Sequence, residues 1–372
     1  MMKISKDQAI IAANVFSDYF DRFDRIDQYM REQKLDAMRE RAATLLGMGP
    51  EEDLFSDFDM SPADMKFELI ELPQKVWDTY LNIISSFMNM SSIPGRSILL
   101  AVKETTTDKL VGFIRLGSPF INCKPRNEML GSVFTQSKTG AQRFNHCAMM
   151  GFVIVPTQPF GFNYLGGKLL AAICTSHTVR EMMNKKYNME TCLFETTSLY
   201  GSTKSVSQYD GMKPYLRFKG LTVSDFMPML PTKKYTDLKH YIEGITGERL
   251  TSNEVSSRKM KRTNIMLSII RNSLKGEPQL KVLNDTIKKA KGLTEQKRYF
   301  VSDYGFENMV DFVNGKDDTL IRGENYDKFE LDNIIEWWRK KAINRYNNLK
   351  SDGRIRTEQE VWTTNKEIDI IR

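Results

Sequence analysis

The segment GFVIVPTQPFGFNYLGGKLLAAI (residues 151–173) begins with a short apolar run, passes through a loop rich in proline and glycine, and continues as an amphipathic stretch. The run that ends at Pro156 predicts a strand, and the spacing of apolar residues after Gly166 and Gly167 predicts a helix. A helix that begins at consecutive glycines presents free backbone N–H groups, which form a favourable site for an anion. We therefore expect Gly166 and Gly167 to hold an anionic group.

Further strands are predicted on both sides of this segment. SILLAVKE (97–104) and KLVGFIRLGS (109–118) are joined by the polar turn TTTD and predict a hairpin, followed by an irregular stretch over 119–140. The helix after the glycines is expected to run to about residue 185. Beyond it we expect, in order, the strand ETCLFETT (190–197), a short helix near 204–209 and the strand YLRFKGLTV (215–223). This order predicts an α/β sheet that is antiparallel at first and crosses over later.

Both ends of the chain have helical periodicity. A helix is expected over residues 5–46, the segment GMGPEEDLFSDFDMSPADM resembles a linker or a helix-start turn, and a second helix is expected over about 72–90. The segments KYTDLKHYIEGITG, SSRKMKRTNIMLSIIRNSLKG and KFELDNIIEWWRKKAINRYNNLK predict helices in the last third. We therefore expect a helical N-terminal extension (1–92), a central α/β domain (93–230) and a basic helical C-terminal region (231–372).

The net charge of +7 is unevenly placed along the chain. Residues 1–230 carry 26 lysines and arginines against 25 aspartates and glutamates, whereas residues 231–372 carry 28 against 22. A basic segment favours an anionic partner, and the alternative is a solvated helical surface.

The cysteines and the apolar runs indicate the cellular compartment of the protein. The four cysteines are scattered without close pairs, so neither a disulfide framework nor a paired-cysteine metal site is indicated. The N-terminal segment has charge spread through it, and no run of about 18 apolar residues occurs. We expect a cytoplasmic protein that spans no membrane, located in the host cytoplasm if a phage encodes it.

The order of hairpin, strand, loop, helix and strand resembles the N-acetyltransferase-like (GNAT) fold. In that family the loop after the fourth strand holds a pyrophosphate, usually that of coenzyme A. The resemblance implies a coenzyme A-type donor held at Val155, Gly166, Gly167 and Lys168, and Asn163 in the loop between them is a further candidate to hold it.

A narrower resemblance lies in the stretches LVGFIRLGSPFINCKPRNEMLG, FVIVP, FNYLGGKLL and CLFETTSLYGSTKSVSQY. They are similar to the domain of the DruA protein of Druantia anti-phage systems and, more distantly, to the phage Mom family of DNA-modifying proteins. The resemblance covers about residues 97–220. The matching positions are Arg126, Asn127, Leu130, Gly131, Asn163, Leu165, Glu195, Thr196, Gly201 and Ser202.

Two residues are candidates for catalysis. Glu195 is predicted at the end of an apolar strand, where a carboxylate is either a desolvated general base or the partner of an arginine. Tyr209 lies where N-acetyltransferases often have a tyrosine that protonates the leaving thiolate, and its alternative role is packing.

A second set of residues could contact a substrate or a nucleic acid. Arginines on the irregular loop could bind a phosphate bidentately or be solvated. A basic cluster at the start of a predicted helix could contact phosphates or form a solvated face. The candidates are Arg126, Asn127, Arg143, Ser202, Lys204, Arg258, Lys259, Lys261 and Arg262.

The histidines and a tryptophan pair complete the candidates. His146, His177 and His240 are far apart in sequence, which favours core or surface roles over a metal site, with His146 beside Cys147 as the alternative. Trp337 and Trp338 are adjacent, so on a helix only one can point straight into a core. The other would pack against a neighbour or stack on a base.

These observations predict a GNAT-like α/β domain with helical extensions. The function that the resemblance implies is a DNA-directed protein of phage DNA modification or anti-phage defence, acting as a transferase on a nucleobase. Two alternatives are a noncatalytic nucleic-acid-binding subunit that keeps the fold, and an acyltransferase that acts on a protein or a small amine.

Overall fold

A seven-stranded mixed sheet with strand order β1-β2-β3-β4-β5-β7-β6 forms the centre of a computed structural model of the protein. The structure describes residues 3–42, 49–86, 95–119, 122–132, 134–198, 207–222, 228–250, 258–293 and 297–362. The strands are β1 (Phe67–Glu71), β2 (Ser97–Glu104), β3 (Lys109–Gly117), β4 (Ala148–Pro156), β5 (Leu193–Ser198), β6 (Arg217–Thr222) and β7 (Lys297–Ser302). Strands β1 to β4 pair antiparallel and β4 pairs parallel with β5, which confirms the α/β class and the predicted crossover.

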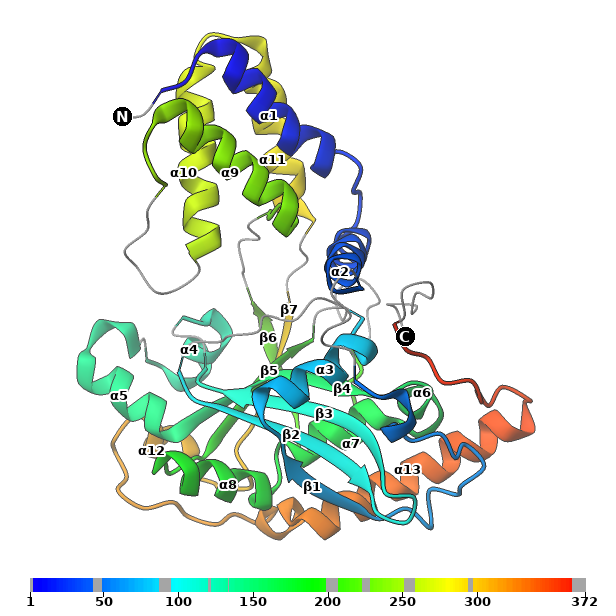
Figure 1. The fold of residues 1–372 in the computed structure, drawn as a ribbon. Helices are drawn as coiled ribbons and strands as arrows, with labels where there is room; N and C mark the ends of the chain where they lie inside the picture. The colour runs from blue at the N-terminus through cyan, green and yellow to red at the C-terminus, as the bar shows by residue number, and fades with distance from the viewer. Residues whose placement is uncertain are drawn as a thin grey trace. The chain divides into compact units, whose positions relative to one another are not determined.

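The sheet has helices on both faces (Figure 1). These helices are α3 (Gln74–Ile84), α4 (Lys124–Leu130), α5 (Lys138–Cys147), α6 (Phe160–Tyr164), α7 (Gly166–Ile173), α8 (His177–Tyr187), α12 (Met309–Val313) and α13 (Leu331–Ser351). Alternate strand residues face opposite sides, so Leu100 and Ile114 pack with the core under α7 and α13, whereas Leu99 and Phe113 pack under α3.

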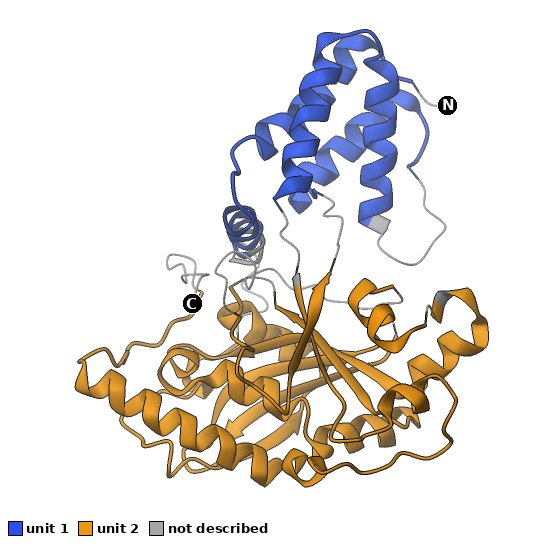
Figure 2. Cartoon of the chain, turned by 180° about the vertical axis from the view of Figure 1, so that it is seen from behind, with its two compact units in different colours: residues 1–43, 224–295, 371 blue, residues 44–223, 296–370, 372 orange. Residues whose placement is uncertain are grey.

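The chain forms two compact units, coloured separately in Figure 2. The helical unit comprises residues 1–43, 224–295 and 371, and the sheet unit comprises residues 44–223, 296–370 and 372. The helical unit contains α1 (Lys6–Phe20), α2 (Ile26–Ala42), α9 (Thr232–Thr246), α10 (Arg258–Ser273) and α11 (Pro278–Gly292). Its core joins apolar faces from distant parts of the chain, such as Phe16 with Ile242 and Ile270. The contacts thus divide the chain differently from the three consecutive segments expected from the sequence.

Three local expectations are corrected by the structure. The last third is not wholly helical, because β7 inserts between β5 and β6 and pairs antiparallel with both. The stretch predicted as irregular contains α4, which has Pro125 in its first turn, and the start of α5, which Ser137 caps by accepting a hydrogen bond from the Gly140 N–H. The helix expected over 5–46 is interrupted between α1 and α2, where the Gln28 side chain accepts from the backbone of Asp24 and Arg25.

The segment after β4 also differs from its prediction. The single helix expected to run to about residue 185 is divided into α6, α7 and α8. Leu165 separates α6 from α7 in the left-handed region (φ 56°), and α7 begins at Gly166 as predicted. Within the short helix expected near 204–209, residues 204–206 lie outside the described residues and residues 208–210 form a turn.

Candidate functional site

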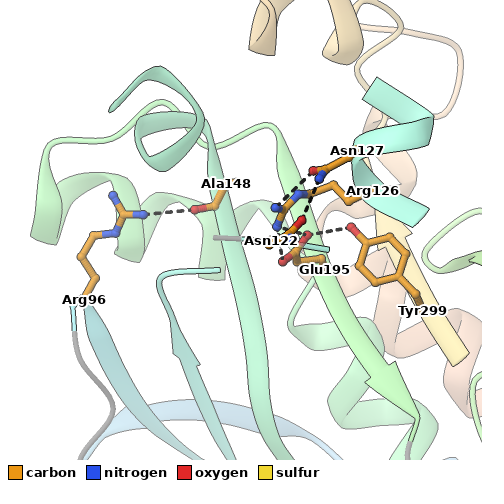
Figure 3. Close-up of polar contacts among 7 residues, drawn as sticks. All are labelled: Arg96, Asn122, Arg126, Asn127, Ala148, Glu195 and Tyr299. Atoms are coloured by element: carbon orange, nitrogen blue, oxygen red, sulfur yellow. Dashed lines mark hydrogen bonds and ion pairs between the residues drawn. The ribbon is translucent and has the colours of Figure 1, made fainter. Parts of the chain in front are cut away.

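Glu195 lies in β5, in the interior of the sheet, and its side chain is 1% exposed. The strand is bordered by β4, where Met150 is opposite Glu195, and by β7, where Val301 is opposite it. Tyr299 of β7 donates its hydroxyl hydrogen to Glu195 Oε2 at 2.6 Å (Figure 3). The carboxylate therefore has one partner from a neighbouring strand.

Arg126 of α4 is the second partner of this carboxylate, and its side chain is fully buried. Arg126 Nη1 lies 3.2 Å from Glu195 Oε1 and 3.4 Å from Oε2 (Figure 3). The guanidinium carbon lies 4.3 Å from the centre of the Phe144 ring. The structure thus brings Arg126 and Glu195, both predicted from the sequence, into one buried ion pair.

Asn127 extends the cluster toward solvent. Its Oδ1 is 3.5 Å from Arg126 Nη2, and its Nδ2 donates to Asn122 Oδ1 at 3.1 Å (Figure 3). Arg96 lies apart from these residues and donates to the Ala148 carbonyl at 3.3 Å. Asn127 therefore contacts the arginine of the ion pair and not its carboxylate.

Burial controls the protonation of the cluster. Desolvation raises the pKa of Glu195, and the charge of Arg126 and the Tyr299 hydrogen bond act in the opposite direction. Burial and the adjacent carboxylate raise the pKa of Tyr299 well above its usual value, so its hydroxyl stays protonated and donates. A desolvated carboxylate held between an arginine and a tyrosine can take up a proton when its environment changes.

Tyr209 does not join this cluster. It is buried and packs edge-on against Phe300 with ring centres 5.4 Å apart, and Thr196 lies within hydrogen-bonding range of its hydroxyl. Burial raises the pKa of the Tyr209 hydroxyl. Because Glu195 and Thr196 are consecutive in a strand, their side chains point to opposite faces of the sheet. The two candidate catalytic residues therefore face different layers.

The loop expected to hold a coenzyme A-type donor makes its contacts within the protein. Buried Asn163 donates to the Arg356 carbonyl at 2.7 Å and accepts from the Arg356 N–H at 3.1 Å. A Cβ at Gly166 would lie 2.7 Å from Phe160 and 2.9 Å from Pro156, so protein atoms already enclose this glycine. These residues do not fit a pyrophosphate bound as the resemblance implied.

Three other residues of that loop are less enclosed. Val155 and Gly167 are half-buried, and a Cβ at Gly167 would meet only the Gln208 side chain. Lys168 donates to the Asp210 carbonyl at 2.5 Å, and burial lowers the pKa of its ammonium group. An anion at the Gly167 end of α7 stays a prediction.

Arg143 is engaged elsewhere in the sheet unit. Its Nε donates to the Phe312 carbonyl at 2.8 Å and its Nη2 donates to the Asp317 carbonyl at 2.9 Å, which fixes the end of α12. Ser202 and Lys204 lie outside the described residues.

The remaining basic candidates lie in the helical unit. Arg258, Lys259, Lys261 and Arg262 fall in the first turns of α10, and the Lys259 ammonium lies 5.2 Å from the centre of the Tyr235 ring. The net positive charge of the C-terminal third lies in its first part. Residues 231–295 carry 14 lysines and arginines against 7 acidic residues, whereas residues 296–372 carry 14 against 15. The positive excess therefore belongs to the segment that supplies α9, α10 and α11.

Trp338 is fully buried and donates from Nε1 to the Tyr164 carbonyl at 2.8 Å, which connects α13 to α6. Trp337 is half-buried and packs against Tyr215 with ring centres 4.8 Å apart. Only Trp338 points straight into the core, as adjacent helical positions predict.

Tyr299 was not among the site residues predicted from the sequence. The segment KRYFVS (297–302) alternates apolar and polar residues only weakly, so its strand was not distinguished from the surrounding helices. Its contact with Glu195 joins residues 104 positions apart.

The described residues bear on metal binding and on membrane crossing. They contain no group of three or more histidine, cysteine, aspartate and glutamate side chains placed to hold a metal ion. Among the described helices, none combines the length and the apolar character that a bilayer crossing requires.

Part of the chain matches one family of known proteins. Residues 64–211 match the profile of the family described as Druantia protein DruA. No curated protein and no solved structure matches the chain. The match confirms the resemblance to DruA, whereas likeness to Mom and to the GNAT fold stays a prediction. The matched segment contains Arg126 and Glu195 and ends before Tyr299.

Proposed function

We propose that this protein is a component of an anti-phage defence system and that it binds DNA through its helical unit. The match to DruA over residues 64–211 supports the first part. The second part depends on one observation, the concentration of the net positive charge in residues 231–295. Positive charge gathered on one unit is typical of proteins that contact phosphates.

Exposed lysines of α9 and α11 are suited to these contacts. Lys233 and Lys234 lie in the first turn of α9, and Lys281 and Lys288 lie two turns apart on α11, all with exposed side chains. Side chains seven residues apart on a helix share a face, so Lys281 and Lys288 can contact the same strand of nucleic acid.

The test is the salt dependence of DNA binding by the full chain. Fluorescence anisotropy with a labelled duplex should show affinity that falls with salt, with a log-log slope of about −0.9 for each phosphate contacted. The variant Lys281→Gln/Lys288→Gln should reduce the slope by about 2 in magnitude, because it removes two phosphate contacts. The matched control is Lys328→Gln/Lys340→Gln, which removes the same charge from exposed positions of the sheet unit. Equal losses in both variants, or affinity independent of salt, would refute the proposal.

A transferase that modifies a nucleobase is the second candidate function. The observation that favours it is the buried carboxylate of Glu195, whose pKa is raised and which could accept a proton from an attacking amino group. The Glu195 side chain is 1% exposed and its oxygens accept hydrogen bonds from Arg126 and Tyr299, so a substrate can reach it only if neighbouring elements move. A noncatalytic DNA-binding role requires no such movement and is the simpler proposal.

Mass spectrometry of nucleosides separates these functions. DNA from cells that express the wild-type chain should contain a modified nucleoside if the transferase proposal is correct, and DNA from cells that express Glu195→Gln should lack it. Unmodified DNA in both, together with salt-dependent binding, would leave the noncatalytic role. An acyltransferase that acts on a protein or a small amine would show neither property.

A further inference from the structure

Three arginines of the sheet unit come together at the C-terminal part of α13. Arg345 lies in α13, and Arg354 and Arg356 follow its end. The guanidinium carbons of Arg345 and Arg356 lie 4.7 and 4.0 Å from the centre of the same ring, that of Phe162 in α6. The Phe162 ring therefore makes cation–π contacts with two arginines.

The positions of these arginines are fixed by hydrogen bonds. Arg345 Nε donates to the Phe162 carbonyl at 3.3 Å. The backbone of Arg356 is held on both its N–H and its carbonyl by the side chain of buried Asn163. The Arg354 N–H donates to the Leu349 carbonyl at 2.8 Å, which holds the chain where it leaves α13. The positions of the three arginines are therefore set partly by hydrogen bonds of the backbone and not by flexible side chains alone.

The charges of this cluster are incompletely balanced. Arg354 pairs with Asp352 at 2.6 Å and Arg356 pairs with Glu360 at 3.3 Å. Within the described residues, Arg345 has no carboxylate partner. Desolvation lowers the pKa of Arg345, and the positive charges of Arg354 and Arg356 lower it further. Three guanidinium groups with two carboxylates would be stabilised by one more anion.

We propose that Arg345, Arg354 and Arg356 form a binding site for a phosphate group. The planar guanidinium group binds phosphate oxygens through paired hydrogen bonds, and arginines already ordered against a ring lose less entropy when they bind. The pair of Arg354 with Asp352 is exposed, with side chains 58% and 48% exposed, so a phosphate can compete with this carboxylate at low cost. The site belongs to the sheet unit and does not depend on the proposed function of the helical unit.

The phosphate could come from a free phosphate compound or from a nucleic-acid backbone. Isothermal titration of the full chain with inorganic pyrophosphate tests the first source, and titration with a short single-stranded oligodeoxythymidylate tests the second. The variants are Arg345→Gln and Arg354→Gln. The latter changes an exposed side chain and tests the site even if Arg345→Gln perturbs packing. Lys340→Gln is the control, because it removes an exposed charge from another face of α13.

Each variant of the site should weaken binding about tenfold, because one or two charge-assisted hydrogen bonds are lost. Weaker pyrophosphate binding in both variants, with Lys340→Gln unchanged, supports a site for a free phosphate compound. Weaker binding of the oligonucleotide alone supports a backbone phosphate. If neither ligand distinguishes the site variants from Lys340→Gln, the proposal is wrong. Arg345, Arg354 and Lys340 all belong to the sheet unit, so the difference between the site variants and Lys340→Gln is independent of whether the helical unit binds DNA.

Discussion

Replacing Arg126 with methionine should lower the free energy of unfolding of the sheet unit by about 3 to 5 kcal/mol at pH 8, because it leaves Glu195 buried without its cationic partner. The two side chains are 0% and 1% exposed, so water cannot replace the lost interaction in the folded state. Methionine fills most of the volume of the arginine, which keeps the cost of a cavity small. Tyr299 still donates to the carboxylate, so we expect a loss near 3 kcal/mol.

The loss should depend on pH. The pKa of Glu195 is raised in the folded protein, so its contribution to stability is complete below the unfolded pKa of about 4.3 and declines as the pH rises through the folded pKa. Removing Arg126 removes the largest influence that lowers this pKa, so the pKa rises further. The difference in stability between Arg126→Met and the wild type should therefore grow from pH 5 to pH 8. The double variant Arg126→Met/Glu195→Gln should show no such growth.

Urea denaturation followed by tryptophan fluorescence is the appropriate assay. All four tryptophans, Trp77, Trp337, Trp338 and Trp362, belong to the sheet unit, so the signal reports that unit alone. A loss of 3 kcal/mol corresponds to a fall in melting temperature of roughly 6 to 12 °C for a unit of this size.

The control is Lys124→Met, which replaces another cation of the same helix with methionine at a side chain that is 68% exposed. It should change stability by less than about 0.5 kcal/mol. If Arg126→Met costs no more than Lys124→Met, or if its cost is the same at pH 5 and pH 8, Arg126 and Glu195 do not stabilise the fold as a pair.

Two further predictions concern residues that the structure places in the core. His177 donates from Nε2 to the Tyr326 carbonyl at 2.9 Å, and burial lowers the pKa of its imidazole. The contribution of His177 to stability is therefore complete above the unfolded pKa of about 6.5 and is lost as the pH falls through the folded pKa. Urea denaturation of His177→Gln should show a smaller loss of stability between pH 7 and pH 5 than the wild type. Asn163→Ala removes both hydrogen bonds to the Arg356 backbone, so trypsin should cleave after Arg356 at least several times faster than in the wild type, as measured by mass spectrometry of the fragments.

Each has an outcome that would contradict it. An unchanged pH dependence in His177→Gln would show that other groups cause the acid sensitivity. For Asn163→Ala, cleavage after Lys340 in the middle of α13 serves as the internal reference. If both bonds were cleaved faster to the same extent, the substitution would have destabilised the whole unit and not released the segment at Arg356.

The parts of this protein that depend on local sequence pattern could be predicted before the structure was known. Short apolar runs, two of them joined by a polar turn, predicted the hairpin of β2 and β3 and the strand β4, and the paired glycines marked the start of α7. Ordered motifs selected Arg126 and Glu195, which lie in different parts of the chain and form one ion pair. The strands and the helix start follow from periodicity and residue type, because each is encoded within a few consecutive positions, whereas the two charged residues were selected by the resemblance to DruA and by their chemistry.

Which distant segments pack together could not be predicted from local patterns, because it depends on contacts across the whole chain. Strand β7 takes its place between β5 and β6 because it pairs with both, and no pattern within its six residues requires this. The same is true of Tyr299 beside Glu195 and of Asn163 on the backbone of Arg356. Periodicity shows which face of an element is buried, but the partner of that face is selected by shape and hydrogen bonding across the whole chain. That selection places the basic segment 231–295 with the N-terminal helices and removes the carboxylate of Glu195 from water.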